Sequence, residues 1–322
     1  MSRGFEVCQL EIPPDESNEL PSCDQKESSH VDWLGVKWEL DAKESVEYVT
    51  KQKPDWLVID HYALDAKWEK ALACCGARLL VIDDLADRKH QADVLLDQNI
   101  LVPSGHQYAD LVNDNCQLLL GPKYALLKSE YYPLAKALPE RDGKISRVLV
   151  FVGGSDPHNL TEKYLEALLH GDFCHLLVDV VVGKNHIPTT RFNDLIASAR
   201  IRVYSGLSSL SALMVRSDLM LGAGGTTNWE RMCLGLTSIV VSVARNQDKI
   251  NKELASTGVV DFLGKAENVG VEEIRRAIRK SLFDCIGNAV SSGKARKMVE
   301  GDGAALVSHL LFAPEVNVNG SA

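Results

Sequence analysis

The stretch "DLMLGAGGTTNWERMCLGLTSIVVSVA", Asp218 to Ala244, decides the fold class of this chain. It reads as a strand, a glycine-rich turn, a helix and a second strand. Neither apolar run alternates with polar residues, so each strand is expected to be buried on both faces. Strands of this kind joined by a helix predict a parallel sheet covered by helices.

The same alternation continues along the chain on both sides of this stretch. In the second half, apolar runs predict strands at residues 147–154, 176–183, 201–206, 218–225, 238–244 and 258–264. Helices are predicted at residues 159–169, 189–199, 207–217, 227–236, 246–257, 271–283 and 301–312. In the first half we predict strands at residues 5–10, 55–62, 77–84, 92–99 and 116–122, helices at 39–52 and 64–75, and a polar surface loop at 13–30. The pattern therefore predicts two Rossmann-like α/β halves.

A charged segment with Pro and Gly, residues 137–146, is the predicted linker between the halves. We expect an N-terminal domain at residues 1–140, a C-terminal domain at 141–312 and a frayed tail at 313–322. A ligand is expected in the cleft between the carboxyl ends of the two sheets. This is the outline of a GT-B-type nucleotide-sugar protein. A periplasmic-binding-protein-like or dehydrogenase-like pair of domains fits the pattern nearly as well.

Composition narrows the classes of partner. The 322 residues are 45% hydrophobic and 25% charged, with a net charge of −9, which argues against a broad nucleic-acid surface. No apolar run reaches membrane-spanning length. The eight cysteines include no C-x-x-C pair, and Cys74 and Cys75 fall in a helical pattern that predicts buried, reduced thiols. Together with a start unlike a signal peptide, this predicts a cytoplasmic protein that uses no metal and no cofactor.

The turn "GAGGTTNWE" is the most specific candidate for a site. The amides of Gly224 and Gly225 and the hydroxyls of Thr226 and Thr227 can cradle a diphosphate where the helix begins. Glu230, one turn into the helix, can accept both hydroxyls of a ribose. The alternative for Glu230 is a first-turn carboxylate that favours the helix dipole.

Two further strand tips of the second half carry polar residues. "FVGGSDPHN" places Gly153, Gly154 and Ser155 after a strand, which suits contact with a phosphate or sugar, or a plain turn in which Asp156 caps the next helix. "ARNQDKIN" places Asn246 and Gln247 after another strand. Their amides suit recognition of hydroxyl or carbonyl groups, and the alternative is a helix start capped by Asn246.

In the first half, "IDHYALD" places Asp60, His61 and Tyr62 at a strand tip. A histidine beside a phenol is a candidate for acid–base chemistry, although a histidine at a strand end is also often structural. "IDDLADR" carries enough carboxylates to suggest a metal. Adjacent Asp83 and Asp84 point apart in a strand, however, so we favour turn formation and pairing with arginine over a metal site.

Six segments in order give the chain a family resemblance. They are "DWLGVKWELDA", "DWLVIDHYALDAKWEKAL", "LLVIDDLADRKHQADVLLDQN", "LLGPKYALLKSEY", "VFVGGSDPHNLT" and "GAGGTTNWERMCLGLTSIVVSVARNQ". Together they resemble the PseG family, whose members have a GT-B-like fold related to MurG-type glycosyltransferases. That family hydrolyses UDP-2,4-diacetamido-2,4,6-trideoxy-β-L-altropyranose to UDP and free sugar, usually without a metal, in pseudaminic acid biosynthesis and hence flagellin glycosylation. The resemblance runs from about residue 4 to about residue 264, plus the helical tail.

The resemblance implies roles for several of these residues. The loop at Gly153 to Ser155, the loop at Gly224 to Thr227, and Glu230 would bind UDP. Tyr62 and Asn246 would lie near the sugar, and we group Asp60 and Gln247 with them at the same strand tips. The implied partner is a small UDP-sugar.

The chain departs from the family at its start. Family members open with a strand and a loop of the form G-S-G-H-x-x-R, whose His is taken as the base, and this motif is absent here. The first domain is therefore expected to lack its first βα unit. We leave the base unassigned, with His61, Tyr62 and Asn246 as candidates. The alternative functions are a UDP-sugar glycosyltransferase and a nucleotide-sugar-binding protein without catalysis.

Overall fold

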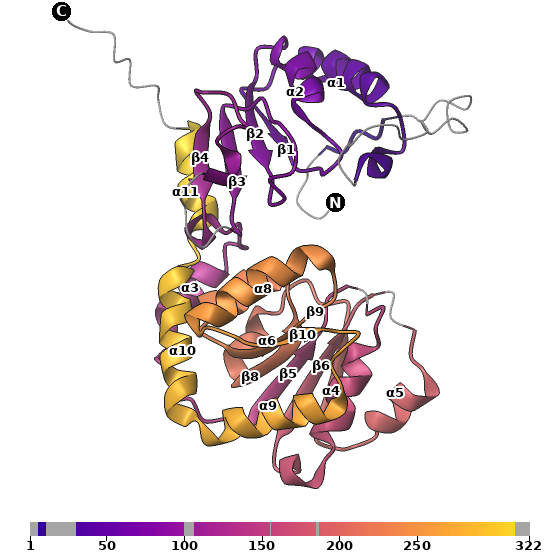
Figure 1. The fold of residues 1–322 in the computed structure, drawn as a ribbon, viewed down its shortest axis with the longest axis vertical. Helices are drawn as coiled ribbons and strands as arrows, with labels where there is room; N and C mark the ends of the chain where they lie inside the picture. Colours follow the sequence, from indigo (N-terminus) through magenta and orange to yellow (C-terminus); the bar gives the residue numbers. More distant parts are fainter. Residues whose placement is uncertain (1–5, 11–29, 100–105, 155, 185–186, 313–322) are drawn as a thin grey trace, which may run out of the picture. The chain divides into compact units, whose positions relative to one another are not determined.

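The computed structural model describes residues 6–10, 30–99, 106–154, 156–184 and 187–312. It divides into two compact units, residues 1–121 and 122–322 (Figure 1). The predicted domain boundary after residue 140 falls inside the second unit. The predicted loop at 13–30 and tail at 313–322 lie almost wholly outside the described residues, and residues 6–10 form no strand.

The first unit contains one parallel sheet in the order β1-β2-β3-β4. The strands are β1 (Trp56–Ile59), β2 (Arg78–Ile82), β3 (Val94–Asp97) and β4 (Gln117–Leu120), joined with α1 (Trp38–Gln52), α2 (Ala66–Ala73) and the 3-10 helices η1 (Val31–Leu34) and η2 (His106–Tyr108). The helices α1 and α2 pack on the sheet through a core that includes Trp68, Leu72 and Val81. Cys74 is exposed and Cys75 is half-buried, contrary to the prediction that both are buried, because α2 ends at Ala73.

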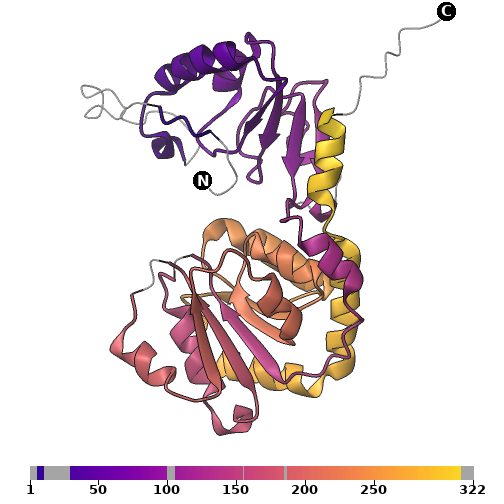
Figure 2. The ribbon, with the colours of Figure 1, turned by 180° about the vertical axis from the view of Figure 1, so that it is seen from behind.

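The second unit contains a six-stranded parallel sheet in the order β10-β9-β8-β5-β6-β7. Its strands are β5 (Arg147–Phe151), β6 (Leu177–Val182), β7 (Ile201–Ser205), β8 (Leu219–Ala223), β9 (Thr237–Ser242) and β10 (Asp261–Lys265). The α-helices are α3 (Tyr131–Ala137), α4 (Leu160–Leu168), α5 (Thr190–Leu195), α6 (Ser211–Arg216), α7 (Thr227–Cys233), α8 (Arg245–Thr257), α9 (Val271–Phe283), α10 (Cys285–Met298) and α11 (Gly303–Phe312); the short 3-10 helices are η3 (Pro122–Tyr124) and η4 (Gly171–Phe173). Figure 2 shows this sheet from behind.

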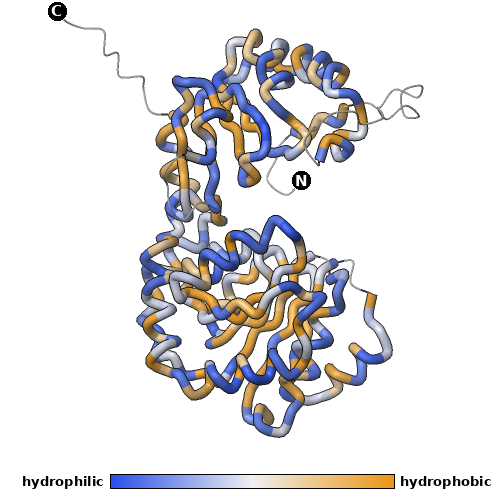
Figure 3. The backbone as a smooth tube through the Cα atoms, in the orientation of Figure 1, coloured by the Kyte–Doolittle hydropathy of each residue, from blue (hydrophilic) through white to orange (hydrophobic). Residues whose placement is uncertain are grey.

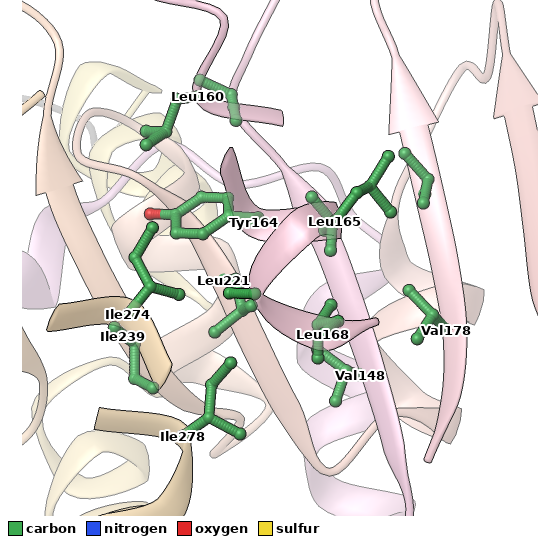
Figure 4. Close-up of a cluster of buried hydrophobic side chains, with 14 of the residues drawn as sticks. Val148, Leu160, Tyr164, Leu165, Leu168, Val178, Leu221, Ile239, Ile274 and Ile278 are labelled. Carbon is green, nitrogen blue, oxygen red and sulfur yellow. The ribbon is translucent and has the colours of Figure 1, made fainter. Parts of the chain in front are cut away.

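Hydrophobic residues concentrate in the strands of this second sheet (Figure 3). On one face, Val148, Leu221 and Ile239 pack against Tyr164 of α4 and Ile274 of α9 (Figure 4). Residues of α6 and α7 are absent from this cluster, although α6 contacts β5 and α7 contacts β9. These helices therefore cover the other face, as expected for a sheet whose strands lack polar alternation.

Two segments of the second unit differ from the prediction. The helix α10 was not predicted, because Gly287, Gly293 and its serines break the apolar periodicity of "CIGNAVSSGKARKM". The predicted linker is not a free connection. Arg141 donates to the carbonyl oxygens of Leu234, Ser217 and Met214 at 3.1, 2.5 and 2.9 Å, which ties the segment to the second unit.

Candidate functional site

The two glycine loops of the second unit lie on neighbouring strands. The chain runs from β5 outward to β6 and β7, and then returns to β8 on the other side of β5. Gly153 and Gly154 follow β5, and Gly224 to Thr227 follow β8. In an open parallel sheet, ligands bind at the carboxyl ends of the strands where the order reverses. Both loops therefore occupy this switch point.

Backbone conformation and packing explain part of the glycine pattern. Gly153 and Gly225 have φ of +113° and +114°, a region that side-chain-bearing residues rarely adopt. A Cβ on Gly224 would lie 2.2 Å from Nδ2 of Asn251. Space is open around Gly154. Packing against Asn251 thus explains the glycine at position 224 without any ligand. Packing among the described residues does not explain the glycine at position 154.

The loop after β5 leads into α4 through an aspartate cap. Asp156 accepts hydrogen bonds from the backbone amides of Leu160 and Thr161 at 2.8 and 2.7 Å. The turn interpretation of this aspartate is therefore confirmed. Ser155, a predicted contact of UDP, lies outside the described residues.

Glu230 lies in the first turn of α7 and faces α3. The helix starts at Thr227, after an exposed Thr226, and neither threonine side chain caps it. Burial raises the pKa of Glu230, against the opposing effects of the Tyr131 hydroxyl and Lys128. Tyr131 is fully buried, and within the described residues its hydroxyl lies near Glu230 but outside good hydrogen-bonding geometry.

Arg231, the next residue, is a buried cation. Its side chain is fully buried, and burial lowers the pKa of the guanidinium to about 9, so it remains charged at neutral pH. It contacts the Ala223 carbonyl oxygen at 3.5 Å and the side-chain oxygen of Asn228, which flank the loop 224–227. Over the part of the chain that the structure describes, no carboxylate pairs with it, and its Nε has no hydrogen-bond partner. A positive charge that has no carboxylate counterion among the described residues therefore lies beside this loop.

A buried amide network holds the start of α7 in place. Asn228 donates to Oδ1 of Asn251 at 3.1 Å, and Asn251 donates to Oγ of Ser242 at 3.0 Å. All three side chains are buried, and they link α7, α8 and β9. Our reading of the sequence did not find Asn228, Asn251 or Arg231. The sequence did contain one signal for them: they are polar residues at positions that the helical periodicity predicts to be buried.

Asn246 and Gln247 lie in the first turn of α8. The N-cap of this helix is Ala244, so the alternative interpretation, in which Asn246 caps the helix, is wrong. Asn246 is exposed. Gln247 accepts from the Val243 amide at 3.0 Å, and its Nε2 lies 3.6 Å from where a Cβ on Gly225 would be. Gln247 therefore borders the loop after β8.

In the first unit, Asp60, His61 and Tyr62 follow β1 directly, with Asp60 exposed. Nδ1 of His61 accepts from the Ala63 amide at 3.1 Å. The neutral ring then carries its proton on Nε2, which makes that nitrogen a donor and not a base. This contact favours the structural interpretation of His61.

Tyr62 meets Asp84 and Asn99 at successive strand tips. The Tyr62 hydroxyl donates to Oδ1 of Asp84 at 2.7 Å, and the Asn99 amide donates to Oδ2 at 2.7 Å. Burial raises the pKa of Asp84, although the hydrogen bond from Tyr62 opposes the rise. Burial and Asp84 together raise the pKa of Tyr62, which stays protonated at neutral pH. Our reading of the sequence considered Asp84 only for a metal or a turn and did not name Asn99, although both follow predicted strands.

Asp83 and Asp84 have different partners, as expected for side chains that point apart, and Asp83 is the buried one. Its Oδ1 lies 2.7 Å from the Arg88 guanidinium, and its Oδ2 accepts from the Ala86 amide at 2.9 Å. The buried Tyr108 hydroxyl is 2.9 Å from Asp83 Oδ2 and 3.0 Å from Asp97 Oδ2. Burial raises the pKa of Asp97 to about 7. Asp83 therefore serves the interior of the unit.

The described residues offer little for other kinds of site. In those ranges no group of three or more His, Cys, Asp or Glu side chains could hold a metal ion, and no helix is long and apolar enough to cross a membrane. A hollow of about 560 Å³ lies at α3 and α10, beside Arg141 and Arg296. Both guanidinium groups are engaged by main-chain carbonyl oxygens, so neither is free to bind an anion in this hollow.

Comparison with known proteins gives distant relatives. No family model matches the chain. An uncharacterized protein of Methanocaldococcus jannaschii, MJ1062, is 29% identical over 199 residues, which are 59% of this chain and 40% of that protein. The UDP-2,4-diacetamido-2,4,6-trideoxy-beta-L-altropyranose hydrolase of Campylobacter jejuni is 25% identical over 219 residues, 67% of this chain and 76% of that enzyme.

Comparison of structures identifies the fold. MurG of Acinetobacter baumannii superposes with a TM-score of 0.60 at 14% sequence identity, over 85% of this chain and 79% of MurG. At this identity the likeness shows the fold alone. The predicted fold class is thus confirmed: the chain is an α/β protein with two Rossmann-like domains of the GT-B type.

Proposed function

We propose that this chain binds UDP-2,4-diacetamido-2,4,6-trideoxy-β-L-altropyranose and hydrolyses it to UDP and the free sugar, a step toward pseudaminic acid. The resemblance of its motifs and the 25% identity to the Campylobacter jejuni hydrolase support this substrate. We also propose a role for each unit: the second unit would bind UDP, and the first unit would contact the sugar.

The observation that carries the proposal is the buried charge of Arg231. A guanidinium that is fully buried without a carboxylate partner in the described residues is costly. Here it lies beside a loop with an exposed Thr226 and open space around Gly154, at the switch point of the sheet. A diphosphate bound at this loop would supply the missing counterion. Glu230, one turn further, would accept the ribose hydroxyls.

The reaction requires water to attack the anomeric carbon while the bond from this carbon to the diphosphate oxygen breaks. Arg231 and the amides of Gly224 and Gly225 would stabilise the negative charge that develops on the departing UDP. Asn246 and Gln247 would contact the sugar from the start of α8. The proton lost by water needs an acceptor, and we assign it to Asp84, acting directly or through the hydroxyl of Tyr62.

The test is a time course of purified chain with the UDP-linked diacetamido sugar, in which free UDP and free sugar are followed together. Equal release of both products supports hydrolysis, and Asp84→Asn is then expected to lower kcat by about 100-fold or more. Release of UDP only in the presence of an acceptor sugar would identify a glycosyltransferase. Calorimetric binding of UDP without release of product would identify a binding protein and overturn the hydrolase assignment.

A further inference from the structure

The ring of Tyr62 lies close to two other aromatic rings, those of His30 and Trp33. The rings of His30 and Trp33 lie 4.7 Å apart in an edge-to-face arrangement. The Tyr62 ring is 5.2 Å from His30 and 5.9 Å from Trp33, measured between centroids. The cluster therefore joins the start of η1 to the tip of β1.

Trp33 does not serve the core of the first unit. Its side chain is 63% exposed, whereas Leu34, the next residue, packs against the core cluster of α1, α2, β1 and β2. η1 is thus anchored through Leu34. A large aromatic surface exposed beside polar groups is a common feature of binding sites, because tryptophan supplies much contact area at little entropic cost.

We propose that Trp33, together with His30 and Tyr62, is the platform for the apolar face of a deoxy-acetamido hexose; this inference rests on the proposed function. Tyr62 belongs to two groups at once. Its hydroxyl bonds Asp84, which also accepts from Asn99, while its ring joins the aromatic cluster. A pyranose that lacks a hydroxyl and carries acetamido methyl groups presents one apolar face and a polar rim, and this pairing of rings with a carboxylate and an amide matches both.

The experiment is saturation-transfer NMR on the full chain with excess UDP-2,4-diacetamido-2,4,6-trideoxy-β-L-altropyranose, with the anomeric signal reporting hydrolysis in the same tube. In the wild type we expect transfer to both the uracil protons and the acetamido methyl protons. Trp33→Ala should lose most of the methyl transfer, keep the uracil transfer and bind the UDP-sugar about 3- to 10-fold more weakly, while UDP alone binds unchanged. Trp33→Phe, which retains a ring, should restore the methyl transfer.

The readouts separate the two proposals. Absent uracil transfer in the wild type would show that the nucleotide assignment is wrong. Present uracil transfer, with methyl transfer and affinity equal in the wild type and Trp33→Ala, would overturn the platform and leave the proposed function standing. Phe283→Ala is the control, because it removes an aromatic ring that is 89% exposed in the second unit, and it should change neither signal.

Discussion

Replacing Arg231 with methionine separates two effects of the buried charge: its cost to the stability of the second unit and its contribution to the binding of UDP. The lowering of the Arg231 pKa from its ordinary range to about 9 corresponds to roughly 5 kcal/mol of destabilisation of the charged form at neutral pH. Methionine removes this cost and leaves the side-chain oxygen of Asn228 without its donor, a loss of about 1–3 kcal/mol. We therefore expect Arg231→Met to stabilise the second unit by about 2–4 kcal/mol in the absence of ligand.

The pH for this comparison follows from linkage. Between the folded pKa of about 9 and the higher pKa of an arginine in the unfolded chain, the unfolded state binds more protons, so the contribution of Arg231 to stability rises with pH. Below pH 9 both states are protonated and the cost is constant. Measurement at pH 7.5 therefore sees the whole effect.

The assay is urea unfolding, monitored by the hydrogen exchange of peptides from β8 and α7. These peptides report on the second unit alone. UDP at about 100 times its Kd should stabilise the wild type by about 2.7 kcal/mol, and this gain should largely disappear in Arg231→Met. Arg141→Met is the matched control. Its guanidinium donates to three main-chain carbonyl oxygens, so its loss should destabilise the protein.

The reasoning is refuted by either of two results. If Arg231→Met is less stable than the wild type without ligand, the guanidinium is a structural tether and its charge is not held at a net cost. If the variant retains the full stabilisation by UDP, the charge of Arg231 does not serve the nucleotide.

Three further predictions concern single groups. Asp97 has a folded pKa of about 7, so between pH 4 and 7 it keeps a proton that the unfolded chain has lost, and its contribution to stability falls by about 2–4 kcal/mol over this range. Asp97→Asn should flatten this pH dependence of the unfolding free energy in urea titrations, and an unchanged slope would contradict the assignment. Glu230→Gln should weaken UDP about 10-fold but 2′-deoxy-UDP much less, measured by calorimetry, and equal losses would exclude contact with the 2′-hydroxyl. Gly224→Ala should destabilise the second unit by about 1–3 kcal/mol, because its Cβ would meet Asn251, and an unchanged urea midpoint would show that the loop yields.

The order of strands and helices, and the parallel class of both sheets, could be predicted from the sequence because apolar periodicity is local. The stretch from Asp218 to Ala244 contains β8, α7 and β9 as predicted. The glycine loops could be placed at strand tips for the same reason. The helix α10 was missed because its glycines and serines give no periodic signal, and it is held instead by packing on α7 and β9.

Only the tertiary structure decided which polar groups meet. Tyr62, Asp84 and Asn99 are far apart in the chain and converge because β1, β2 and β3 are neighbours with their carboxyl ends at one edge. His61 and Tyr62 are adjacent in sequence, yet one turns to its own backbone and the other to Asp84. The burial of the Arg231 charge likewise cannot be predicted from the sequence of the short helix α7. Burial and the absence of a counterion depend on long-range packing, and local sequence carries no information about the distance to a group on another strand.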